Sequence, residues 1–522
     1  MRFFNTAGPC EASRHYLVPP MERLPEAPRF VERFQYFVVH APRQSGKTTS
    51  LRAFVQHLTA SGQWAALLVS CEGARMMGDD YGSAEEAILT EIALRSQESL
   101  PSELRPPQGW PIDSPAGSRI SGGLTEWSRA CPRPIVLVLD EIDALTGASL
   151  LSVLAQLRAG HASRPGGFPA SVVLCGMRAV RDYKMASGGG PVRLGSSSPF
   201  NVLVESLRID DFSESDIRSL YGQHTAETGQ AFEEGAIQAA LRLSGGQPWL
   251  VNALAREVVE KMGILPSEKI TAEQVEKAGE RLILARATHL DSLASRLTED
   301  RVRRILEPMI SGGNVGGDTY DDDFQYVRDL GLIGRQQPAR MSNPIYREVI
   351  VRVLSLVAEG NIAIEPHSFK HPDGSLDIRL LLEEFRTFWI ENGDVLAGRM
   401  PYHEVSPQLV IMAFLQRVVN GGGLVDREYG IGRGRIDLLV RWPLPDRSYQ
   451  REALELKVWA PKKRDPTQQG LKQLDDYLAR VGLDHGWLVL FDRRPEAPPI
   501  DERTTLTEER TPSGRVVGVL RA

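Results

Sequence analysis

The sequence predicts an α/β protein made of several domains, and three observations lead to this fold class. The chain has 522 residues, more than one hydrophobic core usually organises, so three or four domains are expected. In its first third, short apolar runs typical of buried strands alternate with helical patterns, as in a parallel sheet covered on both faces. Near its end, strands with alternating apolar and polar residues surround one amphipathic helix, which indicates a smaller mixed α/β domain.

Composition narrows the class of protein. Hydrophobic residues make up 42% and charged residues 25% of the chain, and the formal net charge is −6. These values exclude a protein that coats nucleic acid through an overall basic charge, so any nucleic-acid contact requires a local basic patch. The four cysteines form no CxxC pair, and we find neither a signal-peptide layout nor an apolar run of ~20 residues. We therefore expect a cytoplasmic protein with reduced thiols and no membrane partner.

The N-terminal domain is expected at residues 1–205. Its predicted strands, each an apolar run, are 34–40, 64–70, 135–143 and 171–177. A stretch rich in Pro, Gly and Ser at 96–123 is expected to be irregular. Helical patterns between the strands predict a parallel sheet with helices on both faces.

Helical patterns dominate the middle of the chain. Residues 206–295 read as successive helices, which we assign to a helical lid. Residues 296–360 read as helix, short hairpin and helix, the order of a winged helix; a small helical spacer is the alternative. Residues 361–400 are expected to be a linker before the last domain at 401–522.

The last domain carries four predicted strands and two predicted helices. The strands are 423–432, 435–442, 453–459 and 485–492. An amphipathic helix is expected before them at 406–423, where glycines end it, and a second one between the last two strands at 471–482. This order predicts a small mixed sheet.

The segment APRQSGKT, residues 41–48, has the pattern of a phosphate-binding P-loop between a buried strand and a helix. In such a loop the backbone amides turn towards the β- and γ-phosphates, Gly46 permits close approach, Lys47 supplies charge and Thr48 offers a hydroxyl to Mg²⁺. Ala41 stands where the pattern usually has Gly, which removes no ligand group. The nucleotide-binding candidates from this segment are Gln44, Ser45, Gly46, Lys47, Thr48 and Thr49. A chance Gly-Lys-Thr is common, but one between a strand and a helix is not.

The second half of the nucleotide site is expected after the strand at 135–143. Asp140 stands at the carboxyl end of this strand, the edge at which parallel sheets bind ligands. There Asp140 would hold Mg²⁺ together with Thr48, and Glu141 would polarise the attacking water. The alternative is a helix start, where acidic residues interact favourably with the helix dipole.

Two further candidates lie away from the loop. Arg178 follows the fourth predicted strand, a position from which it would sense the γ-phosphate; an ordinary surface arginine is the alternative. Pro248 follows Gly246 and Gln247 at the head of a helix. It marks either a simple helix start or a lid that closes over the nucleotide.

Together these motifs resemble the bacterial AAA-like ATPases related to the STAND and archaeal-type group. The resemblance rests on the P-loop, the DEID strand end, the SPFN stretch and GGQPWLVNAL, and it covers roughly residues 1–355. It implies a P-loop NTPase core, a helical lid with a Gly-x-Pro motif, a winged helix, and ATP and Mg²⁺ as cofactors. Because AAA-type cores usually bind nucleotide between neighbouring subunits, it also implies a homo-oligomer.

A second site is expected in the last domain. The strand ALELKVW, 453–459, carries Glu455 and Lys457 between apolar residues, and Asp437 shares their face if its strand pairs with this one. Two adjacent carboxylates repel each other, which raises one pKa unless a cation lies between them. Mg²⁺ held by Asp437 and Glu455 resolves the repulsion, and Lys457 would then orient or deprotonate a water and stabilise the phosphate transition state. A solvated strand face is the alternative for Glu-x-Lys alone.

The order Asp … Glu-x-Lys resembles the PD-(D/E)xK nuclease superfamily, over roughly residues 401–495. Gln473 and Tyr477, four residues apart on the following helix, match the family's fourth motif. Ile436 stands where the family usually has Pro, which loosens the match but leaves the ligands. The resemblance implies a restriction-endonuclease-like mixed α/β domain, with Gln473 as a further catalytic residue. Basic residues that would hold phosphates flank both strands, at Arg427, Arg433, Arg435, Arg441, Lys462, Lys463 and Arg464. The alternative is that they are ordinary surface residues paired with Asp426 and Asp465.

The two resemblances imply an enzyme that couples ATP hydrolysis to Mg²⁺-dependent cleavage of nucleic acid, with DNA as the expected substrate. By analogy with similar fusions, they imply a role in defence against foreign DNA. Two alternatives stay open. One is a STAND-like ATPase switch whose C-terminal domain only binds DNA, and the other is a DNA-binding regulator that acts through its winged helix.

Overall fold

The computed structural model describes most of the chain, which forms two units. The described residues are 2–111, 113–177, 203–285, 289–290, 293, 296–297, 299–310, 321–336, 339–350, 369–399, 411–412, 414–415, 424–431, 434–446, 448–459, 461 and 463–522. The first unit comprises Met1–Asp291 and Gly317–Tyr346, and the second comprises Ser292–Gly316 and Arg347–Ala522. The two units are described separately.

The first unit is built on a five-stranded sheet. Its strands are β1 (Tyr36–His40), β2 (Ala65–Ser70), β3 (Ile135–Asp140), β4 (Ser171–Gly176) and β5 (Leu203–Arg208). Their order is β2-β3-β4-β1-β5, and every neighbouring pair is parallel. The first four confirm the predicted strands, and the parallel sheet is confirmed. The sequence did not predict β5, which runs across the expected boundary at residue 205 and continues the sheet to Arg208.

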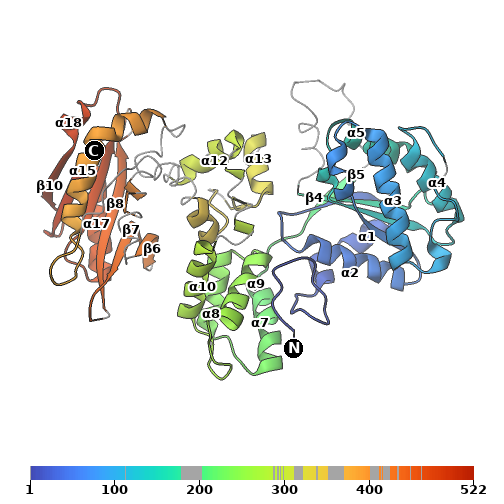
Figure 1. Cartoon of the computed structure of the whole chain (residues 1–522), viewed down its shortest axis with the longest axis horizontal. Coiled ribbons are helices and arrows are strands. Elements are labelled where there is room, and N and C mark those ends of the chain that lie inside the picture. The colour runs from blue at the N-terminus through green and yellow to red at the C-terminus, as the bar shows by residue number, and fades with distance from the viewer. Residues whose placement is uncertain are drawn as a thin grey trace. The chain divides into compact units, whose positions relative to one another are not determined.

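Helices cover both faces of this sheet (Figure 1). They are α1 (Ala27–Glu32), α2 (Lys47–Ala60), α3 (Tyr81–Ser99), α4 (Arg119–Ala130) and α5 (Gly147–Gly160). Alternate residues of β1 belong to two cores. Tyr36 and Val38 pack in the core that includes α3, α4 and α5, whereas Phe37 and Val39 pack in the core with α1 and α2. Both faces of the strand are buried, so the strand reads as one apolar run.

The irregular stretch expected at 96–123 is shorter than predicted. Helix α3 continues to Ser99 and α4 begins at Arg119. Ile120, Leu124 and Trp127 of α4 are buried in the sheet's core. Their helical spacing lies in a glycine-rich segment, which hid the helix in the sequence.

The segment after β5 is helical, as predicted. Its helices are α7 (Glu214–Thr228), α8 (Glu234–Ser244), α9 (Pro248–Arg256) and α10 (Ala272–Leu284), with a π-helical turn at Glu257–Lys261. Ser213 and Asp216 form a capping box that starts α7, and Gly229 and Gly245 end α7 and α8 in left-handed conformations. Their function as a lid remains a prediction.

The predicted winged-helix segment shows part of the expected order. Helix α13 (Asp322–Asp329) is followed by an antiparallel bridge between Ile333 and Met341 and by helical residues at 344–350. Helix α12 (Asp300–Ile310), placed in the same predicted domain, belongs to the second unit. The winged helix therefore stays a prediction.

The second unit contains a six-stranded mixed sheet. Its strands are β6 (Leu424–Ile431), β7 (Gly434–Pro443), β8 (Tyr449–Trp459), β9 (Trp487–Asp492), β10 (Thr505–Arg510) and β11 (Val516–Arg521). Their order is β10-β11-β9-β8-β7-β6, with β8, β9 and β11 parallel and the remaining pairs antiparallel. The four predicted strands are present, and β10 and β11 extend the sheet beyond the prediction.

Two helices cover the faces of this sheet. Leu471, Leu474 and Tyr477 of α17 (Thr467–Val481), a predicted helix, pack with Ala453 and other buried residues of the sheet. Phe385 and Trp389 of α15 (Ile378–Arg399) contact the Phe491 ring, with ring centroids 6.4 and 5.3 Å apart. The linker expected at 361–400 is therefore wrong for its second half, because aromatic residues of α15 bury against β9.

Some predicted features fall outside the described residues. Of the helix expected at 406–423, only 411–412 and 414–415 are described, and they are helical. Arg178 and the SPFN stretch also lie outside. Among the helices that the structure describes, none is long and apolar enough to cross a membrane.

Candidate functional site

The P-loop connects β1 to α2 and is shaped by two left-handed residues. Gln44 has φ 57° and Gly46 has φ 84°, and these conformations turn the loop sharply. A Cβ atom at Gly46 would stand 2.7 Å from Nη1 of Arg23, so a side chain there would displace the arginine. The loop brings the N-terminal amides of the 14-residue helix α2 to the carboxyl edge of the sheet, an arrangement that binds phosphate.

The Lys47 ammonium lies within its own loop. Its Nζ donates to the carbonyl oxygens of Ala41 at 2.8 Å and Pro42 at 2.7 Å, and Oγ of Ser45 donates to the same Pro42 oxygen. Burial lowers the pKa of Lys47. Ala41, the departure from the usual pattern, is fully buried and supplies a carbonyl acceptor, a role for which its methyl group is irrelevant.

Thr48 and Asp140, predicted as partners, are hydrogen-bonded. Oγ1 of Thr48 donates to Oδ2 of Asp140 at 2.9 Å. Asp140 ends β3 and is buried, and its Oδ1 accepts the Glu141 amide at 2.9 Å. A hydroxyl and a carboxylate held together in this way are the hard oxygen ligands that Mg²⁺ prefers, so these residues fit that ion.

Glu141 is held by a residue that the sequence did not single out. Its backbone is left-handed, with φ 56°. Its Oε2 accepts a hydrogen bond of 2.7 Å from Oγ of Ser70, the last residue of β2. Ser70 stands in register with Asp140 on the neighbouring strand. The strand order, and no local motif, therefore holds the Glu141 carboxylate at the carboxyl ends of β2 and β3.

A cavity opens beside the loop in the first unit. It is lined by Asn5, Thr6, Ala7, Gly8, Cys10, Tyr16, Leu17, Val18, Pro20, Arg23, Gln44, Gly46, Thr49, Ser50, Phe212, Leu220, Pro248, Trp249 and Asn252. Gln247 caps the start of α9 and donates from Nε2 to the Gln44 carbonyl at 3.3 Å. The predicted Gly-x-Pro turn thus contacts the P-loop directly, and Pro248 lines the cavity.

Asn252 gives this cavity a polar wall. Its Nδ2 donates to the Pro248 carbonyl at 2.8 Å. Its Oδ1 is buried and has no hydrogen-bond partner among the described residues. A buried acceptor without a donor is costly, and Asn252 is one of the residues that line the cavity. The sequence offered no signal for it, because an asparagine inside a helix has no recognisable pattern.

Residues 5–10 form another wall and tie two helices together. The Cys10 amide donates to Oγ1 of Thr49 in α2 at 2.9 Å. From α9, Nε1 of Trp249 donates to the Thr6 carbonyl at 2.8 Å, and Nη1 of Arg256 donates to Oγ1 of Thr6 at 2.7 Å. Thr49, predicted to bind nucleotide, therefore uses its hydroxyl to hold this segment.

The second predicted site lies between β7 and β8. Leu438 pairs with Leu454, so Asp437 and Glu455 stand side by side on the same face. Oδ2 of Asp437 accepts the Leu456 amide at 2.8 Å, and Oε1 of Glu455 accepts from Nζ of Lys457 at 2.5 Å. The structure thus brings together the three polar residues predicted here.

The carboxyl group of Glu455 is in an unusual state. Its residue is 4% exposed, and Oε2 is buried without a hydrogen-bond partner in the described part of the chain. Burial, and next the negative charge of Asp437, raise the pKa of Glu455 to about 7. The solvated strand face considered for this strand is therefore wrong, because α17 covers it. A cation-binding role fits this unpartnered oxygen beside a second carboxylate.

Helix α17 contributes differently from the prediction. Gln473 is exposed and makes no hydrogen bond within the described residues, whereas Tyr477 is buried. The turn that lies over the site carries Gly470 instead. A Cβ atom there would approach Cγ of Lys457 to 3.3 Å. No group of three or more His, Cys, Asp or Glu residues suited to a metal occurs among the residues described. The carboxylates of Asp437 and Glu455 are thus not joined there by a third ligand of these types.

Comparisons with known proteins bear on the first unit. Residues 33–183 match the family model for an AAA domain. No curated protein sequence matches the chain. Three similar solved structures are a Walker-type ATPase of Pyrococcus abyssi, the RuvB Holliday junction branch migration motor of Thermotoga maritima and Cdc6p of Pyrobaculum aerophilum.

The similarity to these structures is low in sequence. Identities are 13%, 14% and 12%, and TM-scores are 0.46, 0.34 and 0.35, in the same order. The matches cover 66%, 63% and 66% of this chain and 99%, 92% and 95% of the others. The match of residues 33–183, which include the P-loop and β3, assigns an AAA-type P-loop ATPase domain to that part of the chain.

Proposed function

We propose that the first unit binds ATP and hydrolyses it. The observation that carries this proposal is the hydrogen bond between Thr48 and Asp140, which joins the two halves of a nucleotide site. The AAA match over the same residues supports it. Thr48 and Asp140 would hold Mg²⁺, which would neutralise charge on the transferring phosphate.

The other residues of this site have separate roles. Lys47 would exchange the carbonyls of Ala41 and Pro42 for phosphate oxygens, and the first amides of α2 would bind the same phosphates. Glu141, held by Ser70, would polarise the attacking water. The unpartnered Oδ1 of Asn252 is a suitable acceptor for the amino group of adenine, which favours ATP over GTP.

The ATPase proposal is tested with the full chain. Lys47→Ala should lose ATP binding, and Glu141→Gln should bind ATP but lose hydrolysis by about 10² to 10³-fold, the range for removing a catalytic group. Lys277→Ala, an exposed lysine on α10, is the control. Phosphate release and binding of a fluorescent ATP analogue are the measurements. Hydrolysis unchanged in both variants would refute the proposal.

For the second unit we propose Mg²⁺-dependent cleavage of a nucleic-acid phosphodiester. The observation that carries it is the buried, unpartnered Oε2 of Glu455, which lies next to Asp437. The other oxygen of the same carboxyl group is paired with Lys457. Asp437 and Glu455 would hold the ion, which would supply Lewis-acid activation at the phosphate. Lys457 would position the attacking water or take its proton. Gln473 has the least support among the proposed catalytic residues, because it is exposed.

The cleavage proposal has its own test. Plasmid and linear DNA, and RNA of matched sequence, are incubated with the full chain and Mg²⁺, with and without ATP. Lys457→Ala should reduce cleavage at least 10²-fold, whereas Lys472→Ala, an exposed lysine of α17, should not. Cleavage that survives Lys457→Ala would come from elsewhere. Hydrolysis of ATP without any cleavage favours a switch whose second unit only binds nucleic acid. Sedimentation with and without ATP tests the expected homo-oligomer.

A further inference from the structure

Three parallel strands of the second unit end at one edge of its sheet, and cations gather there. β8, β9 and β11 are neighbours and end at Trp459, Asp492 and Arg521. Cationic side chains follow these strand ends at Lys463, Arg464, Arg493, Arg494 and Arg503. The carboxyl ends of parallel strands are where such sheets bind ligands. This edge also adjoins the second site, because Glu455, Lys457 and Trp459 alternate along one face of β8.

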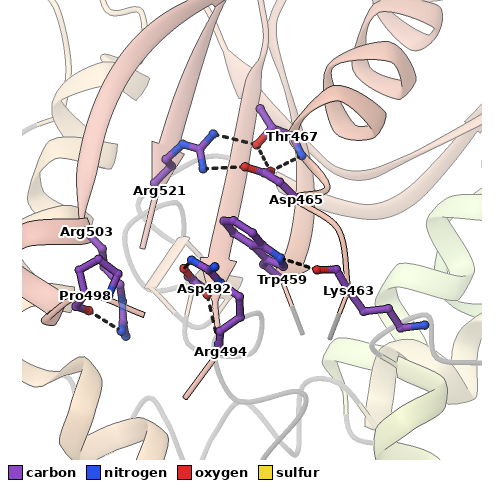
Figure 2. Close-up of polar contacts among 9 residues, drawn as sticks. All are labelled: Trp459, Lys463, Asp465, Thr467, Asp492, Arg494, Pro498, Arg503 and Arg521. Carbon is purple, nitrogen blue, oxygen red and sulfur yellow. Dashed lines mark hydrogen bonds and ion pairs between the residues drawn. The ribbon is translucent and has the colours of Figure 1, made fainter. Parts of the chain in front are cut away.

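Part of this edge is internally paired. Arg494 donates from Nε and Nη2 to the two oxygens of Asp492, at 2.9 and 2.7 Å, and its guanidinium carbon lies 3.4 Å from the Trp459 ring centroid (Figure 2). Nε1 of Trp459 donates to the Lys463 carbonyl at 3.0 Å. This stack fixes the turn after β8 to the end of β9.

Arg521 forms a second anchor at this edge. Its Nη2 donates to Oγ1 of Thr467 at 2.8 Å, and its Nη1 lies 3.5 Å from Oδ2 of Asp465 (Figure 2). Asp465 and Asp492 are thus each engaged by an arginine. Glu496, Asp501 and Glu502 are exposed nearby in the sequence.

The other cations are not paired. Lys463, Arg464, Arg493 and Arg503, which we call the basic edge, have no carboxylate within ion-pair distance among the described residues. Arg503 donates from Nη1 to the Pro498 carbonyl at 3.0 Å, and its Nε is buried without an acceptor (Figure 2). Burial, and next the charge of Arg503, lower the pKa of Arg493, and the charge of Arg503 also contributes to the lowered pKa of Asp492.

Arg493 and Arg503 are half-buried cations at the same edge, and an anion bound there would be attracted to both. Arginine binds phosphate oxygens with several donors at once, and Arg493 and Arg503 keep donors free for that purpose. Lys463 and Arg464 are exposed on the neighbouring turn, so the basic edge offers cations to more than one phosphate. Repeated phosphates on one molecule are the chemistry of a nucleic-acid strand.

We propose that the basic edge binds the phosphate backbone of a nucleic-acid strand and leads it to the Glu455–Lys457 pair. The inference rests on the cleavage function proposed for the second unit and names the surface that holds its substrate. The stacked side chains of Arg494 and Trp459 lie at this surface. The phosphate contacts come from Arg493, Arg503, Lys463 and Arg464. Backbone contacts of this kind read no base sequence.

Binding without cleavage tests the proposal. The full chain carrying Glu455→Gln is titrated into labelled single-stranded and duplex DNA and RNA oligonucleotides, without Mg²⁺ or ATP, at several salt concentrations. Adding Arg493→Ala and Arg503→Ala should raise Kd at least tenfold. The slope of log K against log salt should fall by about 0.7 to 0.9 for each phosphate contact removed.

Two further variants complete the test. Lys463→Ala with Arg464→Ala changes exposed side chains only and should also weaken binding, so a folding defect would not explain the result. Arg451→Ala with Arg480→Ala removes the same charge from exposed positions at the start of β8 and the end of α17, and should leave Kd unchanged.

The outcomes separate this inference from the cleavage proposal. Binding that is equal in the basic-edge variants and in the Arg451/Arg480 control overturns the inference, as does the absence of any binding at low salt. Tight binding by the basic edge without cleavage in the unmutated chain supports the inference and refutes the cleavage proposal alone. Cleavage that persists unchanged in the basic-edge variants refutes the inference alone.

Discussion

The two candidate sites differ in how their polar groups are satisfied. In the first unit, Lys47, Thr48 and Glu141 each have a hydrogen-bond partner within the protein. In the second, Glu455 keeps one buried oxygen without a partner. In the P-loop site a ligand must replace hydrogen bonds that already exist. In the carboxylate site a cation would bind an oxygen that has no partner. Substitutions in the two sites should therefore have opposite effects on stability.

The largest effect is expected at Gly46. Gly46→Ala combines a φ of 84° with a contact of 2.7 Å to Arg23, so ATP-analogue binding should fall at least 10²-fold. Gly62→Ala is the matched control, since Gly62 has φ 79° but no neighbouring atom within 4 Å of the added Cβ. Equal losses in both variants would show that backbone strain alone, and not the Arg23 contact, matters.

A stability change of opposite sign is expected in the two sites. Glu455→Gln removes a buried charge and should raise the free energy of unfolding of the second unit by about 1 to 3 kcal/mol while abolishing cleavage. Thr48→Val removes the hydroxyl that donates to Oδ2 of the buried Asp140 and should destabilise the first unit by about 1 to 2 kcal/mol. Denaturant unfolding monitored in each unit measures both. A loss of stability in Glu455→Gln would contradict the description of that site.

A smaller effect is expected at Ser70, which positions Glu141. Ser70→Ala should lower kcat for ATP hydrolysis by roughly threefold to tenfold, about the free energy of one hydrogen bond, with little change in KM. Ser70→Thr keeps the hydroxyl and should restore the rate. If KM rises instead, Ser70 affects nucleotide binding and does not act by positioning Glu141.

The smallest effect concerns pH. His289 shares a hydrogen bond with Tyr346, and burial followed by the charge of Arg43 lowers its pKa to about 4. In the unfolded chain the pKa of His289 is near 6.5, so the unfolded state binds a proton on this imidazole more readily than the folded state does. The contribution of His289 to the free energy of unfolding is therefore complete above pH 6.5 and is lost as pH falls towards 4. His289→Gln should flatten the decline in unfolding free energy between pH 6.5 and 5.5. A decline of unchanged slope would assign it to other groups.

The difference between the sites also explains what the sequence could predict. The P-loop is contiguous, and β1 and β3 are uninterrupted apolar runs, so the loop and Asp140 follow from local patterns. Asp437, Glu455 and Lys457 were found because two alternating strands are close in sequence and pair as expected.

What the sequence could not predict depends on long-range order. Ser70 reaches Glu141 only because β2 lies beside β3. β5 joins the sheet next to β1 although it follows a long segment poor in apolar residues. The exposure of Gln473 and the burial of Glu455 depend on the rotation of α17 against the sheet, which sets Gly470 over Lys457. Spacing on a helix fixes which residues share a face, but not which face meets the sheet.

The segment at residues 5–10 has a practical consequence. Thr6 is held by two side chains of α9, and Cys10 by one of α2, so the segment stays in place only while these helices keep their spacing. If α2 and α9 move apart, the hydrogen bonds to one of these helices must break, and the segment 5–10 is released from that helix. The rate of protease cleavage within residues 5–10, or of alkylation of the Cys10 thiol, would then measure how often the nucleotide cavity opens.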